Sequence, residues 1–287
     1  TWNYSGGALL WDAKTGEQIG KTMRYEGSVS GAAFDKTENS ILTWGRGDGT
    51  ARLWDTNTGE QIGKTMQHKD GIYGAVFDPA GKYILTWSAD SSARLWDANT
   101  GEQCGKPMLH KDAVNGAAFD HIGRRILTWS DDDTVCLWDT NTGKQHGKTM
   151  QHDGDVRGAV FDKTEKRILT WSYDNTARLW DTETGESTSS VMQHEGDVYG
   201  AAFDQAEKRI LTWSNDYTAR LWDANTGEQL GKAMQHEDWI KGAVFDQGGT
   251  RILTWSDDDT ARLWYAKTNE QIGKTMQHET AIDGAVF

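Results

Sequence analysis

ILTWSYDNTARLWD, residues 168–181, is one of seven similar copies in this chain. Each copy contains a Leu-Trp dipeptide, usually followed by Asp, and successive dipeptides are 43 residues apart once and 42 residues apart five times. A period near 42 marked by Trp-Asp is typical of β-propellers, in which each repeat forms one four-stranded sheet. The tryptophans of the dipeptides are Trp11, Trp54, Trp96, Trp138, Trp180, Trp222 and Trp264.

Each copy divides into four strand-like segments, as residues 68–110 illustrate. Residues 72–77 are apolar and end at a polar turn, which predicts a buried first strand. Residues 83–88 (YILTWS) and 93–97 (ARLWD) are rich in residues that favour strands and predict the second and third strands. Residues 102–109 (EQCGKPML) predict a weaker fourth strand. No segment has a sustained helical period, so no helix is expected.

The two ends of the chain predict a closed ring. The chain starts at Thr1, in the middle of a second strand, and stops at Phe287, where a first strand ends. We therefore expect an all-β, seven-bladed β-propeller of four-stranded antiparallel blades. Its composite last blade would take its first strand from Ile282–Phe287 and the rest from Thr1 onward. This arrangement predicts one domain over residues 1–287, cut from a longer chain.

Composition is consistent with a domain that does not enter a membrane. The net charge is −13, and no apolar run approaches the ~20 residues that a membrane helix needs. Cys104 and Cys136 occupy unrelated slots of their copies, so neither a disulfide framework nor a metal site is expected. A reducing, cytoplasmic compartment follows as the expected location.

A polar set repeats with the copies and resembles the WD-repeat β-propeller family, particularly its bacterial members with near-identical repeats. In that family a His before the first strand, a Ser or Thr in the second, an Asp in the next turn and the Trp of the third form a buried hydrogen-bonded network. The matching residues here are His68, Thr86, Asp90, Trp96, His110, Thr128, Asp132, Trp138, His152, Thr170, Asp174, Trp180, His194, Thr212, Asp216, Trp222, His236, Thr254, Asp258 and Trp264.

These sets contain a His, an Asp and a hydroxyl, yet they predict architecture and not catalysis. A nucleophilic triad is a single solvent-reachable arrangement, whereas this set recurs five times at fixed spacing. The histidines are about 42 residues apart, which is not the local spacing of a zinc site. We therefore predict no enzyme activity, no metal and no cofactor. The first blade has Tyr25 in place of the His and is expected to lack the network.

A second tryptophan recurs in each second strand. Its sevenfold repetition favours packing between blades, while a glycan- or small-ligand-binding propeller that uses these aromatic inter-blade sites, or the central channel, is the alternative. The column consists of Trp2, Trp44, Trp87, Trp129, Trp171, Trp213 and Trp255.

The copies differ most where two loops of each blade are expected to share one face, which we call the upper face: the approach to the first strand and the turn after the second. Copies should stay alike where only packing matters, so this divergence favours binding there, although drift at exposed turns also produces variability. Large side chains concentrate on the fourth to sixth blades. The predicted binding residues are Tyr73, Arg157, Tyr173, Tyr199, Tyr217, Trp239 and Lys241.

The sequence therefore predicts a non-enzymatic scaffold or sensor module, expected to be monomeric, that binds a protein or peptide through its upper face. Exposed aromatic residues beside Arg are typical of interface hot spots. The remaining upper-face side chains are mainly acidic, which opposes nucleic acid and favours a partner of basic or mixed charge.

Overall fold

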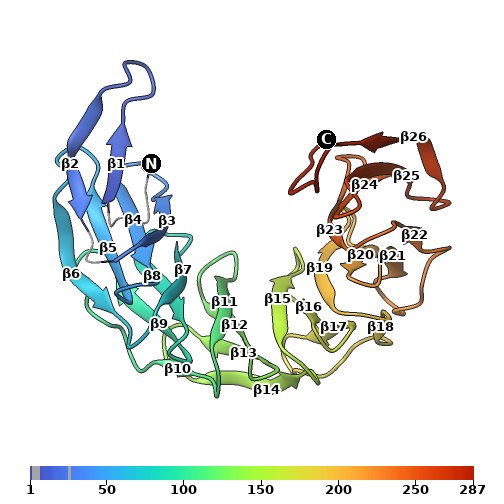
Figure 1. Cartoon of the computed structure of the whole chain (residues 1–287). Helices are drawn as coiled ribbons and strands as arrows, with labels where there is room; N and C mark the ends of the chain where they lie inside the picture. The colour runs from blue at the N-terminus through green and yellow to red at the C-terminus, as the bar shows by residue number, and fades with distance from the viewer. Residues whose placement is uncertain (2–6, 25–26) are drawn as a thin grey trace. The chain divides into compact units, whose positions relative to one another are not determined.

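The computed structural model describes residue 1, residues 7–24 and residues 27–287. In these residues the chain forms only β-strands and no helix. The strands make seven antiparallel sheets, six of four strands and one of two, which confirms the all-β, seven-bladed prediction. The chain divides into two compact units, Thr1–His146 and Gly147–Phe287, with the boundary inside the strand β14 (Figure 1).

The first unit contains the two-stranded sheet and three four-stranded sheets, in chain order. Its strands are β1 (Gly7–Trp11) and β2 (Gln18–Arg24); β3 (Val29–Phe34), β4 (Ser40–Gly45), β5 (Thr50–Asp55) and β6 (Gln61–Gln67); β7 (Ile72–Phe77), β8 (Tyr83–Ser88), β9 (Ser92–Asp97) and β10 (Met108–Leu109); and β11 (Val114–Phe119), β12 (Arg125–Ser130), β13 (Thr134–Asp139) and β14 (Gln145–Gln151).

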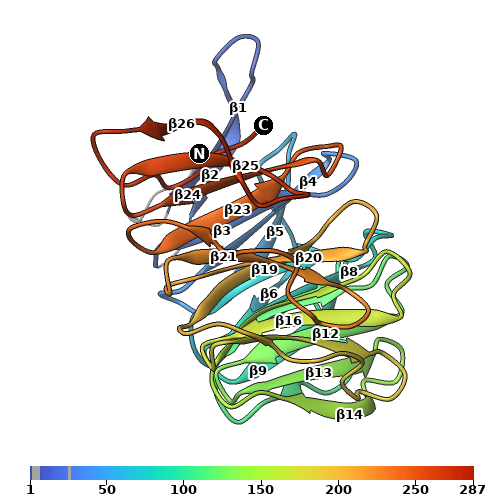
Figure 2. The ribbon, with the colours of Figure 1, turned by 90° about the vertical axis from the view of Figure 1, so that its right-hand side faces the viewer.

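The second unit contains three four-stranded sheets, whose colours run from yellow-green to red in Figure 2. Its strands are β15 (Val156–Phe161), β16 (Arg167–Ser172), β17 (Thr176–Asp181) and β18 (Met192–Gln193); β19 (Val198–Phe203), β20 (Arg209–Ser214), β21 (Thr218–Asp223) and β22 (Met234–Gln235); and β23 (Ile240–Phe245), β24 (Arg251–Ser256), β25 (Thr260–Tyr265) and β26 (Gln271–Gln277).

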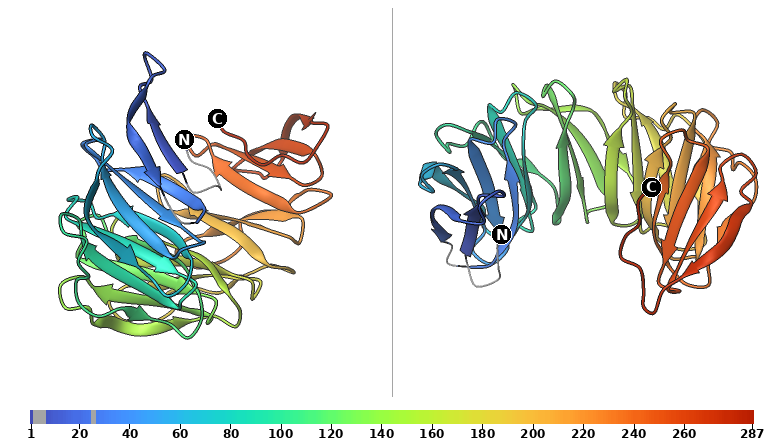
Figure 3. Two further views of the ribbon diagram at one scale, coloured as in Figure 1. Left: turned by 60° about the vertical axis from the view of Figure 1, so that its left-hand side comes forward. Right: turned by 90° about the horizontal axis from the view of Figure 1, so that it is seen from above.

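The hydrophobic core of each unit lies between successive blades. The second strand of one blade contacts the first strand of the next, as β16 contacts β19 and β20 contacts β23. Within each unit successive blades lie side by side (Figure 3). In one such layer Leu179 and Met192 of one blade pack with Ile210 and Trp222 of the next. The inner strands are buried on both faces and are therefore nearly continuous apolar runs, whereas the outer strand is mostly exposed and polar.

The composite blade is described only in part. Near the N-terminus β1 pairs with β2 as a two-stranded sheet. The expected first strand at Ile282–Phe287 is not formed, although Ile282 is buried against Leu253 and Ala261. Its only backbone link to β24 is a 3.5 Å bond from the Ile282 amide to the Ser256 carbonyl, so no strand ladder develops. Closure of the ring by both termini stays a prediction.

The fourth strand occurs in two forms. It is seven residues long in β2, β6, β14 and β26 but only two residues long in β10, β18 and β22. The prediction of a strand over 102–109 is therefore wrong for most of its length, since β10 covers only Met108–Leu109 and Gln103 forms an isolated bridge. Pro107 has no amide hydrogen to donate to a ladder. The other two short strands have Val191 and Ala233 at the position of Pro107, directly before the Met, where all four long strands have Thr.

Candidate functional site

The predicted polar sets are hydrogen-bonded in all five blades that carry the full motif. In the blade of His152, the ring Nδ1 lies 2.9 Å from an Asp174 carboxylate oxygen, and Nε2 lies 2.7 Å from the Thr170 hydroxyl. The indole of Trp180 donates to the same hydroxyl at 2.8 Å. His68, His110, His194 and His236 make the same contacts in their blades. In the first blade Trp54 still donates to Thr43, while Tyr25 lies outside the described residues.

The aspartates of these sets are held as carboxylates. Burial alone would raise the pKa of Asp90, but hydrogen bonds from Ser92, the Lys69 amide and His68 outweigh it and lower the pKa to about 2. Burial lowers the pKa of His68, although Asp90 opposes the shift. In the neutral imidazole of His68, Nδ1 carries the hydrogen and donates it to the Asp90 carboxylate. Nε2 is then an acceptor, to which the Thr86 hydroxyl donates. Each group is satisfied by its neighbours.

The second tryptophan column packs against glycine. In each described blade with a first strand, a Cβ added to the third residue of that strand would overlap the indole of the paired second strand, as at Gly200 beneath Trp213. Trp171 and Trp213 also border hydrophobic layers between blades. Trp2 lies outside the described residues. This glycine was not predicted, although it recurs in every copy.

Four of the predicted binding residues form a continuous row on the second unit. The Arg157 guanidinium lies 4.7 Å from the centre of the Tyr173 ring. Tyr173 meets Tyr199 edge to face with centroids 5.6 Å apart, and Tyr199 meets Trp239 at 6.1 Å. The side chain of Trp239 is 46% exposed. We call Arg157, Tyr173, Tyr199 and Trp239 the aromatic row.

The other predicted binding residues lie outside this row. Lys241 makes ion pairs with Asp257 at 2.9 Å and Asp283 at 3.0 Å, so its charge is already compensated. Tyr217 is exposed and has a left-handed backbone (φ 68°), but among the described residues it has no ring contact with the row. Tyr73 belongs to the first unit, where the Arg46 guanidinium lies 4.6 Å from its ring centre.

Carboxylates surround the aromatic row. Asp238 accepts a hydrogen bond from the Trp239 amide at 2.8 Å. Burial and the proximity of Tyr173 and Asp197 raise the pKa of Tyr199, which stays a neutral phenol. Within the described part of the chain, Glu195, Asp197, Glu237, Asp238 and Asp259 make no ion pair.

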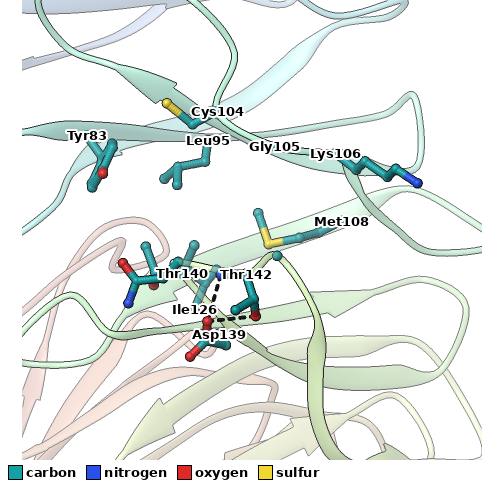
Figure 4. A pocket seen from close by; sticks show the side chains of 12 residues that line it. Tyr83, Leu95, Cys104, Gly105, Lys106, Met108, Ile126, Asp139, Thr140 and Thr142 are labelled. Carbon is teal, nitrogen blue, oxygen red and sulfur yellow. Dashed lines mark hydrogen bonds between the residues drawn. The ribbon is translucent and has the colours of Figure 1, made fainter.

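Three hollows of the described structure open on the first unit. One, of about 550 Å³, is lined by Phe34, Phe77 and Phe119 at the ends of three first strands. In the second unit the corresponding rings are covered, since Arg167 lies over Phe203 and Arg209 over Phe245. Ser40 and Tyr83 occupy the position of that arginine in two blades of the first unit. A second hollow, of about 260 Å³, is lined by Ala8, Met23 and Ile41. The third, of about 140 Å³, lies beside Tyr83 (Figure 4).

The described residues contain no cluster of three or more His, Cys, Asp or Glu side chains that could hold a metal ion. They also contain no helix long and apolar enough to cross a membrane.

Comparisons with known proteins agree with the propeller architecture. A search of curated protein sequences finds no significant match. Among solved structures, the crystal structure of the computationally designed Ika8 protein is similar, with a TM-score of 0.75, over 97% of this chain and 84% of that chain. At 20% sequence identity this similarity shows the fold alone. The sequence model of the IFT122 first beta-propeller family matches residues 3–265. Because this match spans most of the chain, the protein belongs to the IFT122 first beta-propeller family.

Proposed function

We propose that the chain is a non-enzymatic binding module that presents the aromatic row to a protein or peptide partner. The main support for this proposal is the geometry of the row. Consecutive blades place Tyr173, Tyr199 and Trp239 in contact, and nearly half of the Trp239 surface is exposed. Aromatic side chains beside an arginine on a rigid scaffold have the composition of a binding hot spot.

The charge around the row supports a partner with basic or mixed charge. The carboxylates that flank Tyr199 and Trp239 have no cationic partner of their own, so a basic segment would complement them. The same charge opposes a phosphate backbone. Arg157 over Tyr173 shows, within this molecule, that a ring of the row accepts a guanidinium.

We further propose that the module is monomeric, resembles bacterial members with near-identical repeats, and works in the cytoplasm. The cytoplasmic location is supported by Cys104 and Cys136, which are both free thiols.

Contacts within single blades account for part of the variability on the upper face, so fewer of its residues need a partner to explain them. The two variable positions of a blade are in contact with each other, as Arg157 is with Tyr173 and Lys241 is with Asp257. Such pairs differ between blades without any partner. Trp239 and the exposed Tyr217 are not explained in this way, and the proposal rests most heavily on Trp239.

Selection of displayed random peptides on the whole chain tests the proposal. Trp239→Ala should weaken the selected peptides ~30-fold or more, since truncating a hot-spot aromatic typically costs over ~2 kcal/mol. Because Trp239 is half exposed, the melting temperature should barely change. Tyr265→Ala is the matched control, an aromatic that is 52% exposed at the end of β25. Peptides that bind Trp239→Ala as tightly as wild type would refute the proposal.

A further inference from the structure

The cavity of about 140 Å³ on the first unit marks a place where the outer strand of one blade does not reach the turn of the next blade. Elsewhere the outer strand of one blade reaches the turn after the third strand of the next. The Lys64 amide donates to the Thr100 carbonyl at 2.8 Å, and the Ser190 amide donates to the Thr226 carbonyl at 3.0 Å. A Cβ on Gly101 or Gly227 would therefore overlap the neighbouring backbone, whereas one on Gly143 would meet nothing within 4 Å.

The charged residues at this contact differ from those at the other contacts. At three other contacts a lysine of the outer strand meets a glutamate of the next blade: Lys21 meets Glu60 at 3.1 Å, and Lys64 meets Glu102 and Lys148 meets Glu186, each at 2.7 Å. The contact of Ser190 with Thr226 forms without such a pair. The corresponding pair here is Lys106 and Lys144, which carry like charges. In the described part of the chain neither lysine has an ion-pair partner. The group that this position lacks is a carboxylate.

At the cavity two polar groups of the chain lack a hydrogen-bond partner among the described residues. The carbonyl of Thr142 corresponds to those of Thr100 and Thr226, but it accepts no hydrogen bond from a described residue. The hydroxyl of Thr140 is buried and has no hydrogen-bond partner, and Thr140 is only 9% exposed. In two other blades the same hydroxyl donates to a carbonyl at 2.9 Å, from Thr56 and from Thr182. A buried polar group without a partner is costly, so a ligand that supplies one would be favoured.

Apolar side chains complete the wall. Tyr83 and Leu95 lie on one side of the cavity, and Ile126 lies with Thr140 on the other (Figure 4). The Lys106 side chain points away from Tyr83 and Thr140 (Figure 4). The titratable groups that line the cavity are Tyr83, Cys104, Lys106 and Asp139. Asp139 accepts hydrogen bonds from the amide and hydroxyl of Thr142.

We propose that this cavity binds a free α-amino acid with an apolar side chain. The ligand's ammonium group would donate to the Thr140 hydroxyl, the Thr142 carbonyl and Asp139, and its carboxylate would replace the missing glutamate beside Lys106 and Lys144. Its side chain would pack on Tyr83, Leu95 and Ile126. The site involves no residue of the aromatic row, so it is independent of the proposed peptide binding.

Titration of the whole chain with L-leucine, followed by NMR, tests this site. Saturable binding is expected, and leucinamide, which lacks the carboxylate, should bind a few-fold more weakly, because an exposed ion pair contributes little. Thr140→Val should weaken leucine binding about fivefold, the effect of one hydrogen bond, without lowering the melting temperature. Lys144→Glu should abolish binding, because it would supply the missing carboxylate and create the Lys–Glu pair that is present at three other contacts.

The matched control is Lys14→Glu, the same charge change on an exposed turn that does not line the cavity. It should leave leucine binding unchanged. The proposal is overturned if wild type shows no saturable binding of L-leucine. It is also overturned if Thr140→Val and Lys144→Glu, both folded, bind leucine as wild type does.

Discussion

The histidine before each first strand links three parts of its blade. His152 connects Asp174 in a turn to Thr170 in β16, and Thr170 in turn accepts from Trp180 in β17. His152→Ala should lower the free energy of unfolding by ~1–3 kcal/mol, because Asp174 and Thr170 lose a buried partner. Thermal or denaturant unfolding measures the change, and peptide binding should be unaffected. His278→Ala, at an exposed position, is the control and should melt like wild type.

The glycine beneath the second tryptophan column allows a flat aromatic ring to lie on the backbone. A methyl group at Gly200 would overlap the indole of Trp213, and an indole in this layer cannot move without displacing its neighbours. Gly200→Ala should therefore destabilise the chain by ~1–3 kcal/mol, the usual effect of overpacking. Gly284→Ala, where a Cβ meets nothing within 4 Å, should be nearly neutral. Equal melting temperatures for the two variants would contradict this packing role.

At the scale of single strands, the outer strand shows how one side chain selects between two backbone forms. In β6 the side-chain amide of Gln61 donates to the Thr65 hydroxyl at 3.2 Å, and β26 repeats this side-chain contact between Gln271 and Thr275. We expect backbone amides of 61–67 to exchange with deuterium more slowly than those of 103–109, because most of the latter lie outside a ladder. Peptide-level exchange within one sample provides the comparison, and equal protection would contradict it.

Strand positions were largely predictable because each inner strand has a local signature. The runs 72–77 and 83–88 were predicted, and the structure forms β7 and β8 at those residues. The polar network was predictable as a set of spacings. The aromatic row could be predicted only as a list, since the contacts between Tyr173, Tyr199 and Trp239 depend on how neighbouring blades pack. For the same reason the pairing of Lys241 with Asp257, which removes it from the candidate surface, was not predicted.

For the whole molecule, repetition multiplies small electrostatic effects. Burial lowers the pKa of His68, His110, His194 and His236 below the ordinary value of 6.5. Hydrogen bonds lower the pKa of Asp90 and of Asp258 from 3.8 to about 2 against the effect of burial. Because the sets recur, a shift that would be minor in one blade acts several times on the stability of the chain.

The stability of the protein should therefore decline over two separate pH ranges as the pH falls. A histidine whose folded pKa is lowered is protonated more readily when unfolded, so its contribution is complete above pH 6.5 and declines as the pH falls below that value. A carboxylate whose folded pKa is about 2 contributes fully above its ordinary 3.8 and loses that contribution as the pH falls toward 2. The melting temperature should be flat above about pH 7, decline from pH 6.5, and fall again below pH 4. Calorimetric scans between pH 8 and pH 2 measure this profile. A melting temperature that stays constant from pH 7 to pH 5 would show that the buried histidines keep their ordinary pKa, and would contradict the tautomer assigned to the network.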